Sequence, residues 1–175
     1  DHEALSAHIK ALRFYNQKCK DEEGWKKFKL ILGNEIYLCR NGLSPETYEK
    51  GERYPHFILL AKDAIGHAQL RELSTRAWKH SFTMFMTRVP TYYKDIEEVI
   101  GVNPGHVIAS SACIGGWLGI CFNNQLRDAA INFITWCKAI FKDDFYLEIQ
   151  PARYEEQIEY NKWLLEIGRR TDTKC

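Results

Sequence analysis

The sequence lacks the short motifs that most often mark a nucleotide-binding or zinc-binding fold. It has no Walker A sequence, and the glycines at 115, 116 and 119 do not make the GxGxxG pattern of a dinucleotide-binding fold. Its six cysteines include no CxxC pair, which argues against a zinc ribbon and against a thioredoxin-type redox site. No internal repeat or low-complexity segment is visible.

The sequence also has no excess of charge and no long hydrophobic run. Lys and Arg number 24 against 23 Asp and Glu, a net charge of +1, so no basic field over the whole chain favours nucleic acid. The apolar runs are too short to cross a bilayer, and the segment Asp1-His2-Glu3 does not resemble a signal peptide. With no sign of secretion, we expect reduced cysteines and a cytoplasmic protein without a membrane partner.

Hydrophobic periodicity predicts an α/β domain. At 175 residues, with 45% hydrophobic and 27% charged residues, the chain is long enough for one domain with a sizeable core. Helical spacing predicts helices over residues 5–19, 64–79, 92–100, 125–141 and 154–169. Apolar runs predict strands over 28–32, 35–38, 55–62 and 145–150 and one that begins at residue 107, with a loop over 40–54. Because helices alternate with strands, we expect a parallel sheet.

The chain is organised around residues 107–116, where a short apolar strand leads through small residues to Cys113 and the glycine pair Gly115-Gly116. Glycine allows the backbone to turn sharply. A strand that delivers a thiol to such a turn is a frequent place for chemistry in α/β proteins. The alternative is a buried structural cysteine, because a free cysteine is often simply packed in the core.

Two further residues are candidates for a site. Glu35 stands between two apolar pieces, and a buried carboxylate needs a partner or a metal ion. The alternative is an edge position that faces water. His56 stands at the entry of the apolar run 55–62, where a lone histidine is more often a hydrogen-bonded structural residue than a ligand.

Five segments taken together resemble a known family. They are residues 1–2 (DH), 33–37 (GNEIY), 54–62 (YPHFILLAK), 108–116 (IASSACIGG) and 141–150 (FKDDFYLEIQ), with Gln157 and Asn161 after the last. In this order and at roughly this spacing they resemble the polymerase-and-histidinol-phosphatase (PHP) domain at the N-terminus of bacterial replicative DNA polymerase III alpha subunits. The similarity covers nearly the whole chain.

The resemblance implies a distorted (β/α)7 barrel, with mainly parallel strands and a cluster of metal ligands at one mouth. The family's Thr-Asp-His histidine corresponds to His2, and its Gly-x-Glu carboxylate corresponds to Glu35. Its histidine before an apolar strand corresponds to His56, and its Ser-x-Cys thiol corresponds to Cys113. The family's early His-x-His and late Asp-x-His have no match here. We therefore expect residues 1–175 to be a PHP fragment that lacks the first strand and the last ligand motif.

The implied cofactors are divalent metal ions, zinc in the first place, with manganese or magnesium as alternatives. Such a site hydrolyses phosphate esters. We expect a fragment of a DNA-directed DNA polymerase, a nucleotidyltransferase, in which this domain is a 3′–5′ exonuclease or a structural support. Its partners would be DNA, through the intact polymerase, and other replisome subunits, and the fragment alone would be inactive. The alternatives are a free-standing PHP phosphoesterase and a purely structural docking module.

Overall fold

The computed structural model describes residues 2–19, 28–49, 51–84 and 86–175. Asp1, which belongs to the first segment of the family resemblance, lies outside the described residues. The α-helices are α1 (Ser6–Phe14), α2 (Ala64–Lys79), α3 (Tyr93–Ile96), α4 (Trp117–Asn123), α5 (Arg127–Phe141) and α6 (Glu155–Thr171). The π-helical turns η1 (Tyr15–Cys19) and η3 (Glu97–Gly101) continue α1 and α3, and the 3-10 turn η4 (Lys142–Asp144) follows α5. The strands are β1 (Gly33–Cys39), β2 (His56–Ala61), β3 (Phe82–Thr83), β4 (Thr87–Arg88), β5 (Pro90–Tyr92), β6 (Val107–Ser110) and β7 (Phe145–Tyr146).

The strands form a five-stranded sheet of order β5-β1-β2-β6-β7 and a separate β3-β4 pair. β2 runs antiparallel to β1 and β6, whereas β5 is parallel to β1 and β7 is parallel to β6. Four strands therefore point one way, and the expected parallel direction fails only at β2. The loop over 40–54 turns the chain back, so that β2 runs beside β1 in the opposite direction. After β2, helices α2 and α3 carry the chain to the start of β6, which again runs in the direction of β1. The prediction of a mixed α/β fold is confirmed, but within the described residues the sheet does not close into a barrel.

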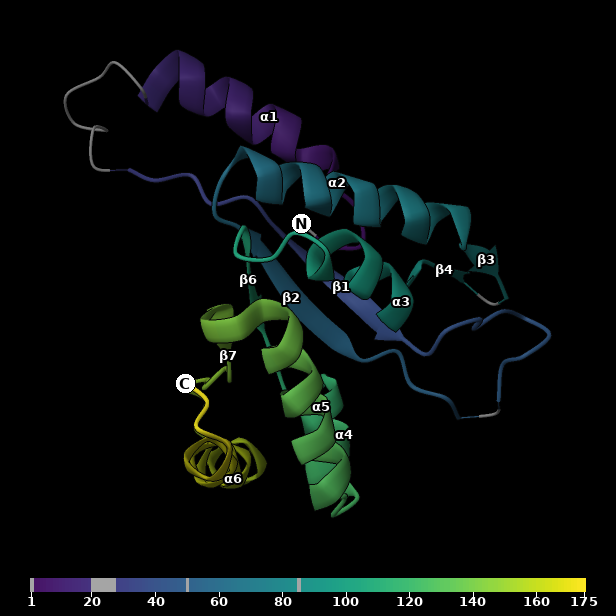
Figure 1. The fold of residues 1–175 in the computed structure, drawn as a ribbon, viewed down its shortest axis with the longest axis vertical. Helices are drawn as coiled ribbons and strands as arrows, with labels where there is room; N and C mark the ends of the chain where they lie inside the picture. The colour runs from purple at the N-terminus through teal and green to yellow at the C-terminus, as the bar shows by residue number, and fades with distance from the viewer. Residues whose placement is uncertain (1, 20–27, 50, 85) are drawn as a thin grey trace.

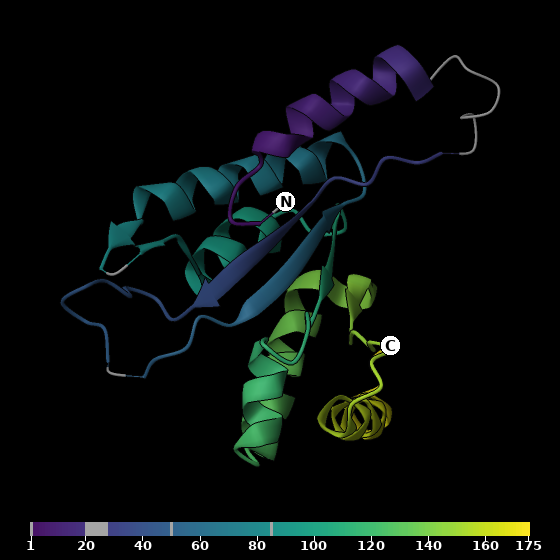
Figure 2. The same cartoon turned by 180° about the vertical axis from the view of Figure 1, so that it is seen from behind.

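Helices lie on both sides of strands β1 and β2. Helices α1, α2 and α3 lie on one side of these strands, and α4, α5 and α6 lie on the other (Figure 1). The view from behind shows the same grouping, with α1 running alongside α2 (Figure 2). Among the described residues, no helix combines the length and the apolar character needed to cross a membrane.

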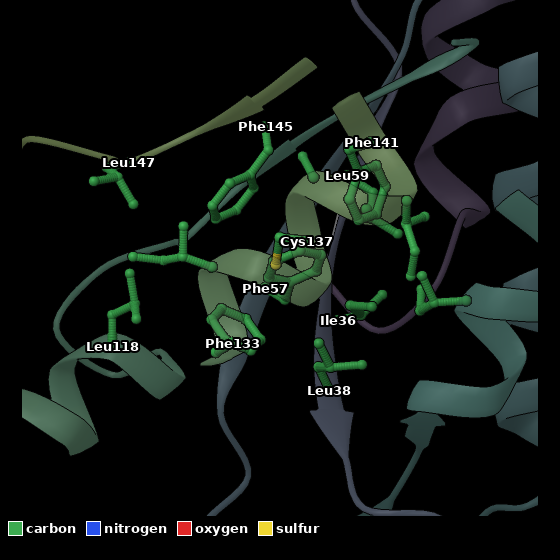
Figure 3. Close-up of a cluster of buried hydrophobic side chains, with 14 of the residues drawn as sticks. Ile36, Leu38, Phe57, Leu59, Leu118, Phe133, Cys137, Phe141, Phe145 and Leu147 are labelled. Atoms are coloured by element: carbon green, nitrogen blue, oxygen red, sulfur yellow. The ribbon is translucent and has the colours of Figure 1, made fainter. Parts of the chain in front are cut away.

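One face of the sheet carries the hydrophobic core. Side chains alternate along a strand, and in β2 Phe57 and Leu59 are buried whereas His56 and Ile58 are half-buried. Figure 3 shows Phe57 facing Cys137 and other α5 side chains. Burying each such large side chain contributes about 1.5–3 kcal/mol. A continuous apolar run such as residues 55–62 predicts a strand buried on both faces. That prediction is wrong here, because β2 is buried on one face only, and its half-buried second face carries the candidate site.

The ends of two strands differ from the prediction. Residues 28–32 form no strand, and β1 begins instead at Gly33. Gly33 pairs with Leu60, and a Cβ atom at Gly33 would lie 2.4 Å from Leu60 Cδ2 and 3.0 Å from the Leu59 carbonyl oxygen, so a larger residue would require the Leu60 side chain to move. β7 ends at Tyr146 because the next backbone N–H groups bond elsewhere: Leu147 to the Lys174 carbonyl and Glu148 to the Ser111 hydroxyl.

Candidate metal centre

Three of the four predicted ligands come together on the half-buried face of the sheet. His2, Glu35 and His56 each offer one ligand atom, and these atoms lie within 4.8 Å of one another. His56 Nδ1 is 2.7 Å from Glu35 Oε1, and His2 Nε2 is 3.8 Å from the same oxygen. We call these three residues the ligand cluster.

Strand register positions Glu35 and His56. Glu35 and Tyr37 lie on the same face of β1, two residues apart. Tyr37 is the register partner of His56 at the start of β2, so His56 stands beside Tyr37 and next to Glu35. The backbone N–H of His56 donates to the Gly115 carbonyl at 3.2 Å, which ties the histidine to the glycine turn.

The segment before α1 brings His2 to the cluster. His2 forms an isolated parallel bridge with Glu35, and the Glu3 N–H donates to the Glu35 carbonyl at 2.8 Å. The Trp78 indole N–H donates to the Glu3 carbonyl at 3.2 Å. α1 itself is anchored by the buried His8, whose Nε2 lies 2.9 Å from the Gly33 carbonyl oxygen. His2 is therefore held beside β1 by its own bridge to Glu35 and by the contacts of Glu3 and α1.

Cys113, the fourth predicted ligand, lies at the edge of the ligand cluster rather than inside it. Its Sγ is 3.7 Å from His56 Nδ1 and accepts a hydrogen bond from the Gly115 N–H at 3.3 Å. The turn before it is tight: Ala112 has φ of +61°, a conformation that costs a non-glycine residue about 1–2 kcal/mol. The contacts around this turn hold the thiol toward His56.

The donor set fits a divalent cation. Nitrogen, carboxylate oxygen and thiolate sulfur are all zinc ligands, and the zinc bond lengths place neighbouring ligand atoms about 3.4–3.6 Å apart in a tetrahedron. The separations of 3.8 Å for His2–Glu35 and 3.7 Å for Cys113–His56 lie close to that spacing. The 2.7 Å His56–Glu35 contact is shorter than this spacing and would lengthen around a bound cation. The ligand role of all four residues remains a prediction.

Comparison with known proteins places the chain in a family. Residues 1–152 match the PHP domain. The chain belongs to the PHP domain family.

Related proteins match this PHP domain over nearly its whole length. It is 44% identical to "Probable DNA polymerase YorL" of Bacillus subtilis and to "DNA-directed DNA polymerase" of Bacillus phage SPbeta, over 98% of this chain and 15% of each relative. It is 30% identical to "DNA polymerase III subunit alpha" of Borreliella burgdorferi, over 96% of this chain and 14% of that protein. The chain therefore spans about 15% of the length of the relatives that it matches.

The site of this PHP domain includes residues that the sequence analysis missed. The Tyr37 ring lies edge-on to His2 at 5.4 Å and tilted against His56 at 5.3 Å between ring centroids. Burial raises the pKa of Tyr37, so it stays neutral. Its position two residues after Glu35 on one strand could have suggested it. Glu3 lies 3.9 Å from His2, and burial raises the pKa of its carboxyl group.

A second carboxylate on the same face is satisfied without a metal ion. Glu148 accepts a hydrogen bond from the Ser110 hydroxyl at 2.7 Å and another from the Gln150 amide at 2.8 Å. It lies outside the ligand cluster. Within this PHP domain, Glu148 therefore braces the strand ends that carry the Cys113 turn.

Three other cysteines, Cys39, Cys121 and Cys137, are free and buried in the core. Burial raises the pKa of Cys39 to about 12 and that of Cys121 to about 11. Cys137, on α5, is fully buried in the core. Thiols with such raised pKa values are poor nucleophiles and poor metal ligands at neutral pH.

Proposed function

We propose that this chain is the N-terminal PHP region of a replicative DNA-directed DNA polymerase, in which it removes nucleotides from the 3′ end of DNA. The polymerase names of the relatives along nearly the whole chain support this assignment. They favour it over a free-standing phosphoesterase. The partners would then be DNA and other replisome subunits, and the location the cytoplasm.

The observation that carries the proposal is the convergence of the ligand set from four separate segments. His2, Glu35 and His56 meet within 4.8 Å, and the Cys113 thiol lies 3.7 Å from His56. We assign these four residues to a divalent cation, zinc first and manganese or magnesium as alternatives. When bound, such cations supply a water nucleophile at neutral pH and stabilise charge at phosphorus.

The protein's own residues hold and orient this set. Glu35 Oε1 lies between the two histidines, and the Tyr37 ring packs against both imidazoles and limits their rotation. In the hydrolysis, a water oxygen bonds to phosphorus and the bond from phosphorus to the 3′ oxygen of the preceding nucleotide breaks. That 3′ oxygen takes up a proton, and a nucleoside 5′-monophosphate leaves.

We further propose that residues 1–175 are part of a larger PHP barrel. β5 and β7 are the outermost strands of the described sheet, and a sheet edge that is only partly paired can accept further strands. The half-buried face that carries the ligand cluster would become the inside of a (β/α)7 barrel. The remaining strands would add the early His-x-His and the late Asp-x-His of the family, and residues 1–175 alone would be inactive.

The test is a hydrolysis assay on the full-length protein. Metal-depleted protein is supplied with zinc or manganese and a 5′-labelled single-stranded oligonucleotide, and shortening from the 3′ end is measured on a gel. Glu35→Gln should lower the rate on the order of 100-fold, whereas the matched control Glu159→Gln, on the exposed side of α6, should leave it unchanged. Equal rates and equal metal content in wild type and Glu35→Gln would make the domain a structural support instead.

A further inference from the structure

A pocket with a volume of about 420 Å³ opens directly beside the ligand cluster. It shares Tyr37 and His56 with the site, and its volume is within the range of small-ligand sites. We call it the tyrosine pocket. Besides these two residues, the lining residues that could contact a ligand through rings, charges or amides are Tyr48, Tyr54, Arg53, Arg88, Asn123 and Asn124.

One wall of the tyrosine pocket is aromatic. The rings of Tyr48 and Tyr54 are nearly parallel, with an interplanar angle of 13° and centroids 6.3 Å apart. Tyr37 continues the series, 5.9 Å from Tyr54 and 5.3 Å from His56 between ring centroids. A row of rings therefore runs from the pocket wall to the ligand cluster. Flat π faces of this kind bind nucleobases by stacking, with little dependence on sequence.

The pocket also carries positive charge. The Arg88 guanidinium lies 4.3 Å from the centre of the Tyr54 ring, and Arg53 lines the same space. Within the described part of the chain, the arginines that lie within 4.0 Å of a carboxylate are others, although Arg88 also interacts electrostatically with Glu3. The one acidic lining residue, Glu52, is already paired with Arg40 at 2.7 Å. Guanidinium groups bind phosphate oxygens with matched geometry.

We infer that the tyrosine pocket binds the terminal nucleotide of single-stranded DNA, with its base on the Tyr48–Tyr54 wall and its phosphate between Arg88 and the ligand cluster. Asn123 and Asn124 also line the pocket, and side-chain amides can form hydrogen bonds with the polar edge of a base. A sugar phosphate would leave the aromatic wall unused. The inference rests on the proposed function, since it names the part of the substrate that this site holds.

The test is photocrosslinking in the full-length protein, with EDTA present so that no hydrolysis occurs. The probe is a single-stranded oligonucleotide whose last nucleotide is 5-iododeoxyuridine, and crosslinked peptides are mapped by mass spectrometry. We expect crosslinks on the peptide that carries Tyr48 and Tyr54. Tyr54→Leu should lower their yield about five-fold or more because stacking is lost, whereas Tyr54→Phe should keep it.

Controls separate the pocket from other DNA contacts. Tyr154→Leu changes an exposed tyrosine at the start of α6 and should leave the crosslink intact. Thymidine 5′-monophosphate should compete with the probe, whereas deoxyribose 5-phosphate should not. Crosslinks that avoid the pocket peptides, that persist in Tyr54→Leu, or that both competitors remove equally would overturn the inference.

The outcomes distinguish this inference from the proposed function. If Glu35-dependent hydrolysis is observed but the pocket peptides carry no crosslink, the hydrolytic function stands and the pocket inference fails. If the pocket peptides are crosslinked but hydrolysis does not depend on Glu35, the domain binds a DNA end without cleaving it, and the proposed function fails.

Discussion

Gly116 closes the turn that carries Cys113, and replacing it with alanine should loosen that turn. A Cβ atom at Gly116 would lie 2.4 Å from the Ser111 carbonyl oxygen, 3.0 Å from that of His56 and 3.2 Å from that of Cys113. The φ angle of Gly116 is −76°, which alanine adopts without strain, so the effect comes from lack of space alone. All three neighbours are backbone atoms, and no side chain can rotate away to make room.

The magnitude follows from the closest contact. Ordinary Cβ contacts begin at 3.4 Å, so the chain on one side must move by about 1 Å, the difference between 3.4 and 2.4 Å. Forcing an extra methyl group into a well-packed place costs about 1–3 kcal/mol. That corresponds to an increase of about 5- to 150-fold in local opening. Because His56 and Cys113 both contact this turn, zinc affinity should fall as well.

Hydrogen–deuterium exchange on the full-length protein measures both effects. Peptides over β6 and α4 should exchange faster in Gly116→Ala, and zinc should protect them less than in wild type. Gly101→Ala is the matched control, because its added Cβ would meet nothing closer than the Ile96 carbonyl oxygen at 4.0 Å. Exchange and zinc affinity identical to wild type in Gly116→Ala would refute the idea that backbone contacts lock the turn.

Two further predictions concern thiols and pH. At about pH 8, iodoacetamide should modify Cys113 in metal-free protein, and zinc should slow this modification several-fold. Cys39 and Cys121 should stay unmodified because burial raises their pKa. Peptide mapping that finds no effect of zinc on Cys113 would count against Cys113 as a ligand. Hydrogen bonds from the Gly66 N–H and from His106 hold the pKa of Asp63 below its ordinary value. The ionised Asp63 carboxylate therefore stabilises the α2 N-terminus fully at any pH above the ordinary pKa, and this stabilisation is lost as the pH falls through the lowered pKa. Amide protection of the first turn of α2, followed by NMR, should show this acid step in wild type and not in Asp63→Ala; a step that persists in the variant belongs to another group.

The sequence pattern predicted the ligands one at a time but not their meeting place. Glu35 was visible as a carboxylate between apolar residues, and His56 as a histidine before an apolar strand. Each of them on its own fitted a structural role equally well. What brings them together is the register of β1 on β2, which depends on contacts between residues 19 to 27 positions apart. The family resemblance, rather than periodicity, linked them before the structure.

The tyrosine pocket was beyond the reach of sequence patterns. Apart from Tyr37, His56 and the turn after Cys113, its residues come from the loop over 40–54, from β4 and from the end of α4. None of these segments has a periodic pattern or a motif. Tyr54 and Arg88 meet because the short β3–β4 pair returns the chain beside the loop. Such contacts depend on loop conformation, for which the sequence offers only turn residues as a guide.

The hydrophobic core, rather than the site chemistry, holds Glu35 and His56 in place. Side chains alternate along a strand, so a slip of one residue in the β1–β2 register would move Glu35 to the core face and Ile36 to the site face. Ile36 and its register partner Phe57 are both buried, and losing the burial of either would cost about 1.5–3 kcal/mol. That cost fixes the register whether or not a cation is bound. Removing the metal should therefore leave the sheet intact, and the ligand cluster is carried by apolar packing on the opposite face.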